Sequence, residues 1–128
     1  MSSLPITSLI AGIMALLLVP LSVQVSLRRA KTNTVFGDAG DETLRRRIRA
    51  HGNFIEYAPL GLIAIGLMEY RGAASWLVWL LGLGFLISRI LHALGMLFAA
   101  TPTLRAMAML INHAGFLAAG VWLVTHSI

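Results

Sequence analysis

Four long apolar segments, each close to the length that crosses a membrane, leave this chain few folds to choose from. We expect helices over about residues 4–27, 47–69, 73–99 and 104–126. A helix needs roughly 20 apolar residues to cross a hydrocarbon core about 30 Å thick, so four helices use nearly all of the 128 residues. The composition agrees, since 58% of the residues are hydrophobic and only 12% are charged. The sequence therefore predicts one domain over residues 1–128, an all-α integral membrane protein built as a four-helix transmembrane bundle.

The connections between these helices and their charges predict a topology. A four-residue connection, 69–72, makes the second and third helices an antiparallel hairpin, and Thr101, Pro102 and Thr103 mark a second short turn, with Thr103 as a candidate helix cap. The positive-inside rule compares the Lys and Arg residues on the two sides of the membrane. Arg71 lies on one side, and the opposite side carries Arg28, Arg29, Lys31, Arg45, Arg46, Arg47, Arg49 and Arg105. We therefore expect the first and third loops in the cytoplasm and both termini in the opposite compartment.

This arrangement also explains the net charge of +5 without a nucleic-acid partner, because the basic residues gather at membrane ends. The run 45–47 is best interpreted as a topology signal that meets anionic lipid head groups. The chain has no cysteine, so any thiol chemistry must come from a ligand. The histidines lack the spacing of metal ligands relative to one another, and we expect no metal site.

Two charged residues, Glu56 and Arg89, lie inside the second and third apolar runs. An ionised side chain at mid-membrane costs about 2.5 to 3.5 kcal/mol on insertion scales, so each needs a partner or a wet cavity. At 1.5 Å per residue both lie about 10 Å in from the same membrane end, given the antiparallel hairpin. An ion pair or a shared ligand is then geometrically allowed, and the alternative is a buried pair that only fixes helix packing.

Helical spacing gathers further polar residues onto faces of the four helices. These face groups are Gln24 and Arg28 on the first helix, Arg49, Asn53, Glu56 and Tyr57 on the second, Arg89, His92 and Met96 on the third, and Arg105 and Asn112 on the fourth. We expect every helix to contribute to one polar layer in the cytoplasmic half of the bundle. Four arginines and one glutamate suit a small ligand with several carboxylates and an amine.

The segment from Arg49 to Pro59 reads R-A-H-G-N-F-I-E-Y-A-P. It resembles the second-helix signature of the MAPEG family (membrane-associated proteins in eicosanoid and glutathione metabolism), R-A-x-x-N-x-x-E-x-x-P. The resemblance extends to Arg28-Arg29 at the end of the first helix, to the Arg89-x-x-His92-x-x-Gly95 pattern, and to Leu104-Arg105. It therefore covers nearly the whole chain, in the form of a small bacterial member.

The resemblance implies a homotrimer that binds glutathione between neighbouring subunits near the cytoplasmic side of a bacterial inner membrane. It implies that Arg105 is the catalytic residue that stabilises the glutathione thiolate. The glutathione-binding residues that we expect are Arg28, Arg49, Asn53, Glu56, Tyr57, Arg89 and His92. The expected partners are membrane lipids, further copies of the chain and a lipophilic electrophile, and the expected activity is that of a transferase or peroxidase.

Met96 departs from the pattern, because many catalytic members carry a tyrosine directly after the third-helix glycine. A thioether donates no hydrogen bond to sulfur, which weakens the expectation of turnover more than that of binding. A non-catalytic membrane protein that retains the pocket therefore stays open as an alternative. A small multidrug-type transporter fits less well, since its membrane carboxylate usually lies in the first helix, and that run has none.

Overall fold

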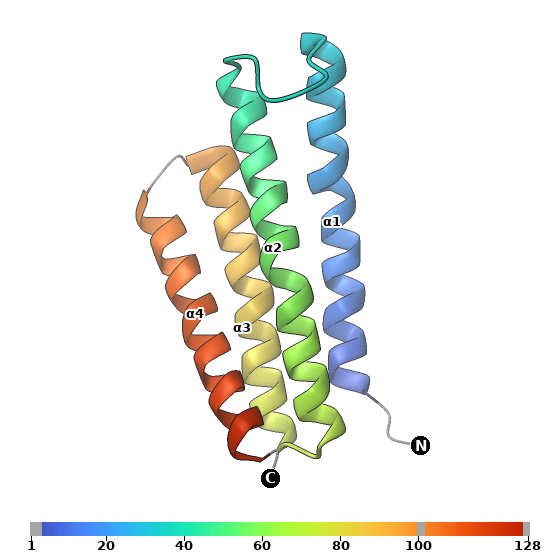
Figure 1. Ribbon diagram of the computed structural model, residues 1–128, viewed down its shortest axis with the longest axis vertical. Coiled ribbons are helices and arrows are strands. Elements are labelled where there is room, and N and C mark those ends of the chain that lie inside the picture. The colour runs from blue at the N-terminus through green and yellow to red at the C-terminus, as the bar shows by residue number, and fades with distance from the viewer. Residues whose placement is uncertain (1–3, 100–101, 127–128) are drawn as a thin grey trace.

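The computed structural model describes residues 4–99 and 102–126, and within them it is entirely helical apart from the connections. The elements are α1 (Pro5–Thr32), α2 (Glu42–Tyr70), α3 (Ser75–Leu94), a π-helical turn η1 (Gly95–Ala99) and α4 (Pro102–Thr125). Successive helices run in opposite directions along one bundle axis (Figure 1). The predicted antiparallel arrangement of α2 and α3 is therefore confirmed.

Three helices in the described part of the chain are long and apolar enough to cross a membrane: α1, α3 with its continuation to Phe98, and α4. The fourth, α2, has 29 residues. Its N-terminal half contains the polar residues of the signature segment, which lower its hydropathy. The bundle is that of a membrane protein, with many large apolar side chains left exposed on its outside.

Two helices are longer at the first loop than the hydrophobic pattern predicts. Helix α1 continues to Thr32 and ends at Asn33, which adopts a left-handed conformation with φ 51°. Helix α2 already begins at Glu42, because the Asp41 side chain accepts the backbone N–H of Leu44 and caps it. The apolar runs stop earlier because they mark the membrane-facing part of each helix and not its hydrogen-bonded ends.

The last helix begins at Pro102, so Thr103 lies inside its first turn and is not the cap that we expected. Proline is tolerated there because the first N–H groups of a helix have no intrahelical acceptor. Thr101 lies outside the described residues. Before this turn, α3 ends at Leu94 and the chain continues as the π-helical turn η1, where the pattern predicts one α-helix to residue 99.

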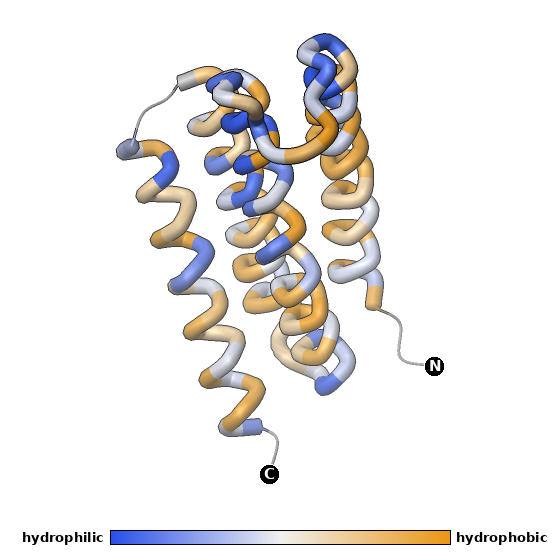
Figure 2. The backbone as a smooth tube through the Cα atoms, turned by 45° about the horizontal axis from the view of Figure 1, so that its top comes forward, coloured by the Kyte–Doolittle hydropathy of each residue, from blue (hydrophilic) through white to orange (hydrophobic). Residues whose placement is uncertain are grey.

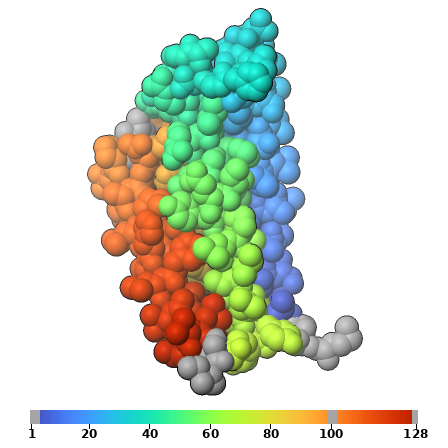
Figure 3. Space-filling model, viewed as in Figure 1, coloured from blue at the N-terminus to red at the C-terminus, as the bar shows by residue number. Residues whose placement is uncertain are grey.

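The central pair of the bundle is α2 and α3, and α1 and α4 flank it on opposite sides (Figure 1). Among the described residues α1 makes no contact with α4. The space-filling view shows α2 on the near surface between them (Figure 3). The core of the bundle includes Ile10, Ile65 and Val78, which are fully buried. Helices α1 and α4 thus pack on the central pair without touching each other in the described structure.

The end of the bundle away from the first loop is closed by Glu69 at the end of α2. Its carboxylate accepts the backbone N–H groups of Ile6, at 2.9 Å, and Thr7, at 2.8 Å. These N–H groups belong to the first turn of α1, which has no side-chain cap of its own. Glu69 therefore both caps α1 and holds it against α2.

Candidate functional site

Hydrophilic residues gather at the end of the bundle where α1 joins α2, as the hydropathy colouring shows (Figure 2). This end carries the first loop, the start of α2, η1 and the start of α4. It is also the end at which the sequence predicts the ligand site.

A basic cavity, here called the arginine pocket, lies at this end between α2, η1 and α4. Its volume is about 260 Å³. The residues that line it are Glu42, Arg45, Arg46, Arg49, Gly95, Met96 and Arg105. The structure thus brings together Arg49 and Arg105, two residues that are 56 positions apart in the sequence and that we singled out separately.

The four arginines of the pocket differ in their partners. Arg45 Nε lies 2.6 Å from Asp38 Oδ2, and Arg46 Nε lies 3.0 Å from Glu42 Oε1. Within residues 4–99 and 102–126, neither Arg49 nor Arg105 forms an ion pair. Arg49 and Arg105 thus face one cavity while neither guanidinium is paired with a carboxylate of the protein, and two such groups favour an anionic ligand.

Arg105 is held in the pocket by η1. Its Nη1 group donates to Met96 Sδ at 3.4 Å, and its Nε atom is buried without a hydrogen-bond partner in the described structure. Gly95 makes this close approach feasible, because a Cβ atom at that position would lie 2.9 Å from Arg105 Cγ. The π-helical turn therefore holds Arg105 through one N–H group and leaves other N–H groups of this side chain without a hydrogen-bond partner in the described structure.

Deeper in the bundle, Arg89 is the centre of a buried polar network. It is 2% exposed, and its Nη1 group donates to the side-chain oxygen of Asn53 and, at 3.3 Å, to the Asn53 carbonyl. Its Nε group donates to Ser88 Oγ at 3.4 Å, and Nη2 lies 3.8 Å from Met109 Sδ. The Tyr57 ring faces the guanidinium, with Cζ 4.8 Å from the ring centroid.

This network separates Arg89 from Glu56. Glu56 is exposed on the outer face of α2 and forms no ion pair or hydrogen bond with another described residue. The buried pair between Glu56 and Arg89 that the matching depths allowed is therefore not formed. The reason is that Asn53 is buried against Arg89 and takes its guanidinium N–H, whereas Glu56, three residues further on, is exposed and stays only within electrostatic range of Arg89.

His92 lies between the two polar regions. It is buried in α3, within electrostatic range of Arg89, Arg105 and Arg49. Asn112, on α4, is also buried, and neither polar atom of its side chain has a partner in the described structure.

Arg28 lies at the same end of the bundle but does not line the arginine pocket. Its Nη2 and Nε groups bind the Asp41 carboxylate at 2.6 and 3.3 Å. This interaction, together with the N–H of Leu44, holds the pKa of the Asp41 carboxyl below its usual range. Arg28 therefore anchors the end of α1 to Asp41 at the start of α2. Its helix makes no contact with α4 in the described structure, so Arg28 does not reach the pocket beside α4.

The predicted single polar layer is wrong in one respect, since its members fall into separate places. Gln24 lines a different groove, between α1 and α3. Conversely, Arg45 and Arg46 line the arginine pocket, although the sequence suggested only a topology role for them. Their spacing of four and three residues from Arg49 places them on its helix face and was the signal available. Nothing in the sequence pointed to Met109 or Ser88 as partners of Arg89.

Comparison with known proteins gives matches over most of the chain. The model of the MAPEG family matches residues 7–125. The inner membrane protein YecN of Escherichia coli, from strain K12 and from strain CFT073, is 36% identical over 90 residues, which are 70% of this chain and 69% of the relative. No solved structure matches the chain.

Proposed function

Because the chain belongs to the MAPEG family, we propose that it binds glutathione in the arginine pocket and conjugates it, through its thiol sulfur, to lipophilic electrophiles. A single observation carries this proposal: Arg49 and Arg105 line one cavity without a carboxylate partner. Glutathione has two carboxylates, one amine and one thiol, which match several guanidinium groups and one free carboxylate. Glu56, exposed and without an ion pair in the described structure, lies outside the arginine pocket on the same helix as Arg49, and we assign it to the amine of a glutathione that extends along α2 from the pocket.

The proposed chemistry is thiolate formation followed by substitution. A free thiol with a pKa of about 8.5 is mostly protonated near neutral pH, and an adjacent guanidinium favours its anionic form. The guanidinium of Arg105, which lines the pocket and forms no ion pair in the described structure, is the group that we assign to the sulfur. The thiol proton passes to solvent, the thiolate attacks the electrophilic carbon, and the leaving group departs with its electron pair. With a hydroperoxide as substrate, the thiolate attacks the terminal oxygen, the O–O bond breaks and the alkoxide leaves as the alcohol after taking a proton. The glutathione sulfenic acid that is formed reacts with a second glutathione to give glutathione disulfide and water.

Binding is tested first. Purified protein in detergent is titrated with glutathione by calorimetry, and Arg49→Gln is compared with the wild type. A lost charged hydrogen bond should weaken binding by about 10- to 100-fold. Arg71→Gln, at the opposite end of the bundle, is the matched control and should bind like the wild type. Equal affinity of the Arg49 variant would remove the pocket from consideration as the glutathione site.

Catalysis is tested with Arg105→Ala and a generic electrophile such as 1-chloro-2,4-dinitrobenzene. We expect conjugation to be abolished while the fold and the glutathione affinity are largely retained, because the residue acts on the sulfur. Full activity of this variant would refute the mechanism and leave the binding proposal standing.

A second candidate function, glutathione binding without turnover, is favoured by Met96. Its sulfur accepts an N–H of Arg105 at 3.4 Å, where a tyrosine would offer a phenolic donor to the ligand. Wild-type protein that binds glutathione but converts neither aryl halides nor hydroperoxides would support this function. Gain of conjugation in Met96→Tyr would then identify the missing group.

For the assembly and location we propose a homotrimer in a bacterial inner membrane. The name of the Escherichia coli relative supports the membrane, and the resemblance to the family supports the trimer. The basic residues support the first and third connections in the cytoplasm and both termini outside it. Alkaline phosphatase fused after the last residue should be active in this orientation. Native mass spectrometry should give three chains per particle.

A further inference from the structure

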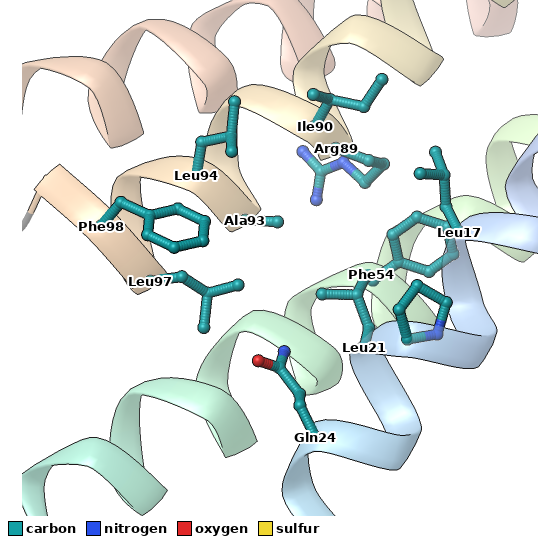
Figure 4. Close-up of a pocket in the computed structure, with 11 residues that line it drawn as sticks. Leu17, Leu21, Gln24, Phe54, Arg89, Ile90, Ala93, Leu94, Leu97 and Phe98 are labelled. Atoms are coloured by element: carbon teal, nitrogen blue, oxygen red, sulfur yellow. The ribbon is translucent and has the colours of Figure 1, made fainter.

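A second cavity lies on the other side of the central pair, between α1 and α3. Its volume is about 360 Å³, and its wall is apolar apart from Gln24 and Arg89. We call this cavity the α1–α3 groove. Leu17 and Leu21 from α1 face Ile90, Ala93 and Leu97 from α3 and η1 across it, as Figure 4 shows. The volume falls near the lower end of the range for ligand sites, roughly 300 to 1,000 Å³.

The groove is long and open on its side. From Leu17 to Gln24 it follows about two turns of α1, or roughly 10 Å along the bundle axis. On the α3 side, Leu94 is 42% and Phe98 is 78% exposed. An apolar chain can therefore enter sideways from the bilayer and lie parallel to the helices.

At its upper end the groove joins a polar cavity of about 280 Å³, with which it shares Gln24, Leu97 and Phe98. Charged residues of α2, Glu42, Arg46 and Arg47, line this mouth. The two cavities together form one amphipathic site, apolar within the bundle and basic at its end.

The mouth has unused hydrogen-bond donors. Gln24 Nε2 is buried without a partner in the described part of the chain, and its amide points into the groove (Figure 4). Arg47 Nη1 donates to the backbone carbonyl of Gln24 at 3.0 Å, which fixes the arginine at the mouth and leaves its other N–H groups available. The negative charge of Glu42 is already met by Arg46, so the mouth keeps a net positive charge.

We propose that the α1–α3 groove is a binding site for one anionic phospholipid. An acyl chain fills the apolar part between α1 and α3, and the phosphate lies at the mouth against Arg47 and the Gln24 amide. A free phosphate would leave the apolar part unused, and a zwitterionic lipid would bring a cation to a basic mouth. The apolar part of this site shares no residue with the arginine pocket, whereas the mouth shares Glu42 and Arg46 with it.

The experiment compares two lipids on delipidated protein in detergent. Palmitoyl-oleoyl phosphatidylglycerol or phosphatidylcholine is titrated in, and bound lipid per chain is counted by native mass spectrometry. Wild type should retain one phosphatidylglycerol per chain in preference to phosphatidylcholine. Arg47→Gln should lower this preference about fivefold, the effect of one basic residue near an anionic head group. Ala93→Phe, which fills the groove, should lower retention of both lipids at least about tenfold.

Matched controls separate the site from general lipid contact. Lys31→Gln removes a charge from the same end of the bundle, and Ala118→Phe adds the same ring to an exposed position of α4. Both should retain lipid like the wild type, and Arg47→Gln should keep the wild-type affinity for glutathione. Arg46 is left unchanged because it lines both cavities.

Several results would overturn the proposal. Equal retention of the two lipids by the wild type would mean unspecific lipid around the protein. Unchanged lipid retention in Ala93→Phe with loss of conjugation would make the groove a path for the electrophile. A changed number of chains per particle with unchanged lipid would make it an interface between copies. If the phenylalanine variant does not fold, Ala93→Ile adds less volume and takes its place, and Arg47→Gln is decisive on the charge.

Discussion

The contact between Asn53 and Arg89 allows a test of what holds α2 to α3 inside the membrane. Asn53 is 5% and Arg89 2% exposed, and the side-chain oxygen of Asn53 accepts a guanidinium N–H. Hydrogen bonds to a charged group contribute about 1.5 to 3 kcal/mol, whereas neutral hydrogen bonds between membrane helices average about 0.6 kcal/mol. Asn53→Ala keeps the backbone acceptor, so we expect it to cost about 2 kcal/mol of unfolding free energy.

The coupling between the two residues is measured with a double-mutant cycle. Arg89→Met removes the charge and leaves the Asn53 side-chain oxygen unpaired, while Asn53 Nδ2 still donates to Met109 Sδ at 3.8 Å, so we expect a cost of about 1 kcal/mol. The double variant leaves neither group unpaired and should also cost only about 1 kcal/mol, which gives a coupling energy of about 2 kcal/mol. Unfolding by sodium dodecyl sulfate in mixed micelles, followed by circular dichroism without glutathione, measures all four proteins.

The chain offers its own control. Asn112 is as deeply buried as Asn53, but its side-chain polar atoms have no partner in the described structure. Asn112→Ala should therefore cost less than about 1 kcal/mol, since it removes an unsatisfied group along with some packing. Additive single variants, or an Asn53→Ala cost no larger than that of Asn112→Ala, would refute the view that Asn53 compensates a buried charge.

Three further predictions concern the arginine pocket and the two ends of α1. Gly95→Ala places a Cβ atom 2.9 Å from Arg105 Cγ and should lower conjugation about 10- to 100-fold by displacing the arginine. Gly12→Ala, in open space, is the control and should leave turnover unchanged. Unchanged turnover in both variants would mean that the Arg105 side chain simply moves aside. Glu69→Ala removes the cap of α1 and should lower the free energy of unfolding by about 1 kcal/mol in the same assay. Hydrogen exchange should become faster only in the first turn of α1, and faster exchange elsewhere instead would argue against the cap. The folded-state pKa of Asp41 is lowered, chiefly by Arg28. The ionised Asp41 therefore stabilises the fold above its unfolded pKa of about 3.9, and this stabilisation is lost as the pH falls below that value. Asp41→Asn should flatten the loss of thermal stability on the acid side, and an unchanged pH profile of the melting temperature would contradict the assignment.

Much of the site was predictable because helical spacing is a property of a single helix. The positions 49, 53, 56 and 57 span one broad face of α2 wherever that helix is packed. The same arithmetic places Arg89 and His92 on one face of α3, and the structure buries both side chains. This arithmetic had no means of finding η1 or the close approach of Gly95 to Arg105, because that approach joins residues of two different helical elements.

The division of the polar layer could not be predicted from spacing. A face of about 100° has two edges, and neighbouring helices decide which edge is buried. In α2, Asn53 meets Arg89 of α3, whereas Glu56 is left on the outside. Gln24 and Arg28, one turn apart on α1, likewise end in different surroundings, since Gln24 lines the α1–α3 groove and Arg28 pairs with Asp41.

The sequence alone determined that this is a four-helix membrane protein with a cluster of cations at one end, because apolar length and charge placement follow from composition along the chain. It also carried the second-helix signature that identifies the family. Only the tertiary structure decided that α1 and α4 stand on opposite sides of the α2–α3 pair. Short loops require neighbouring helices to be antiparallel, but the order of four helices around an axis depends on side-chain packing. That order separates the arginine pocket from the α1–α3 groove.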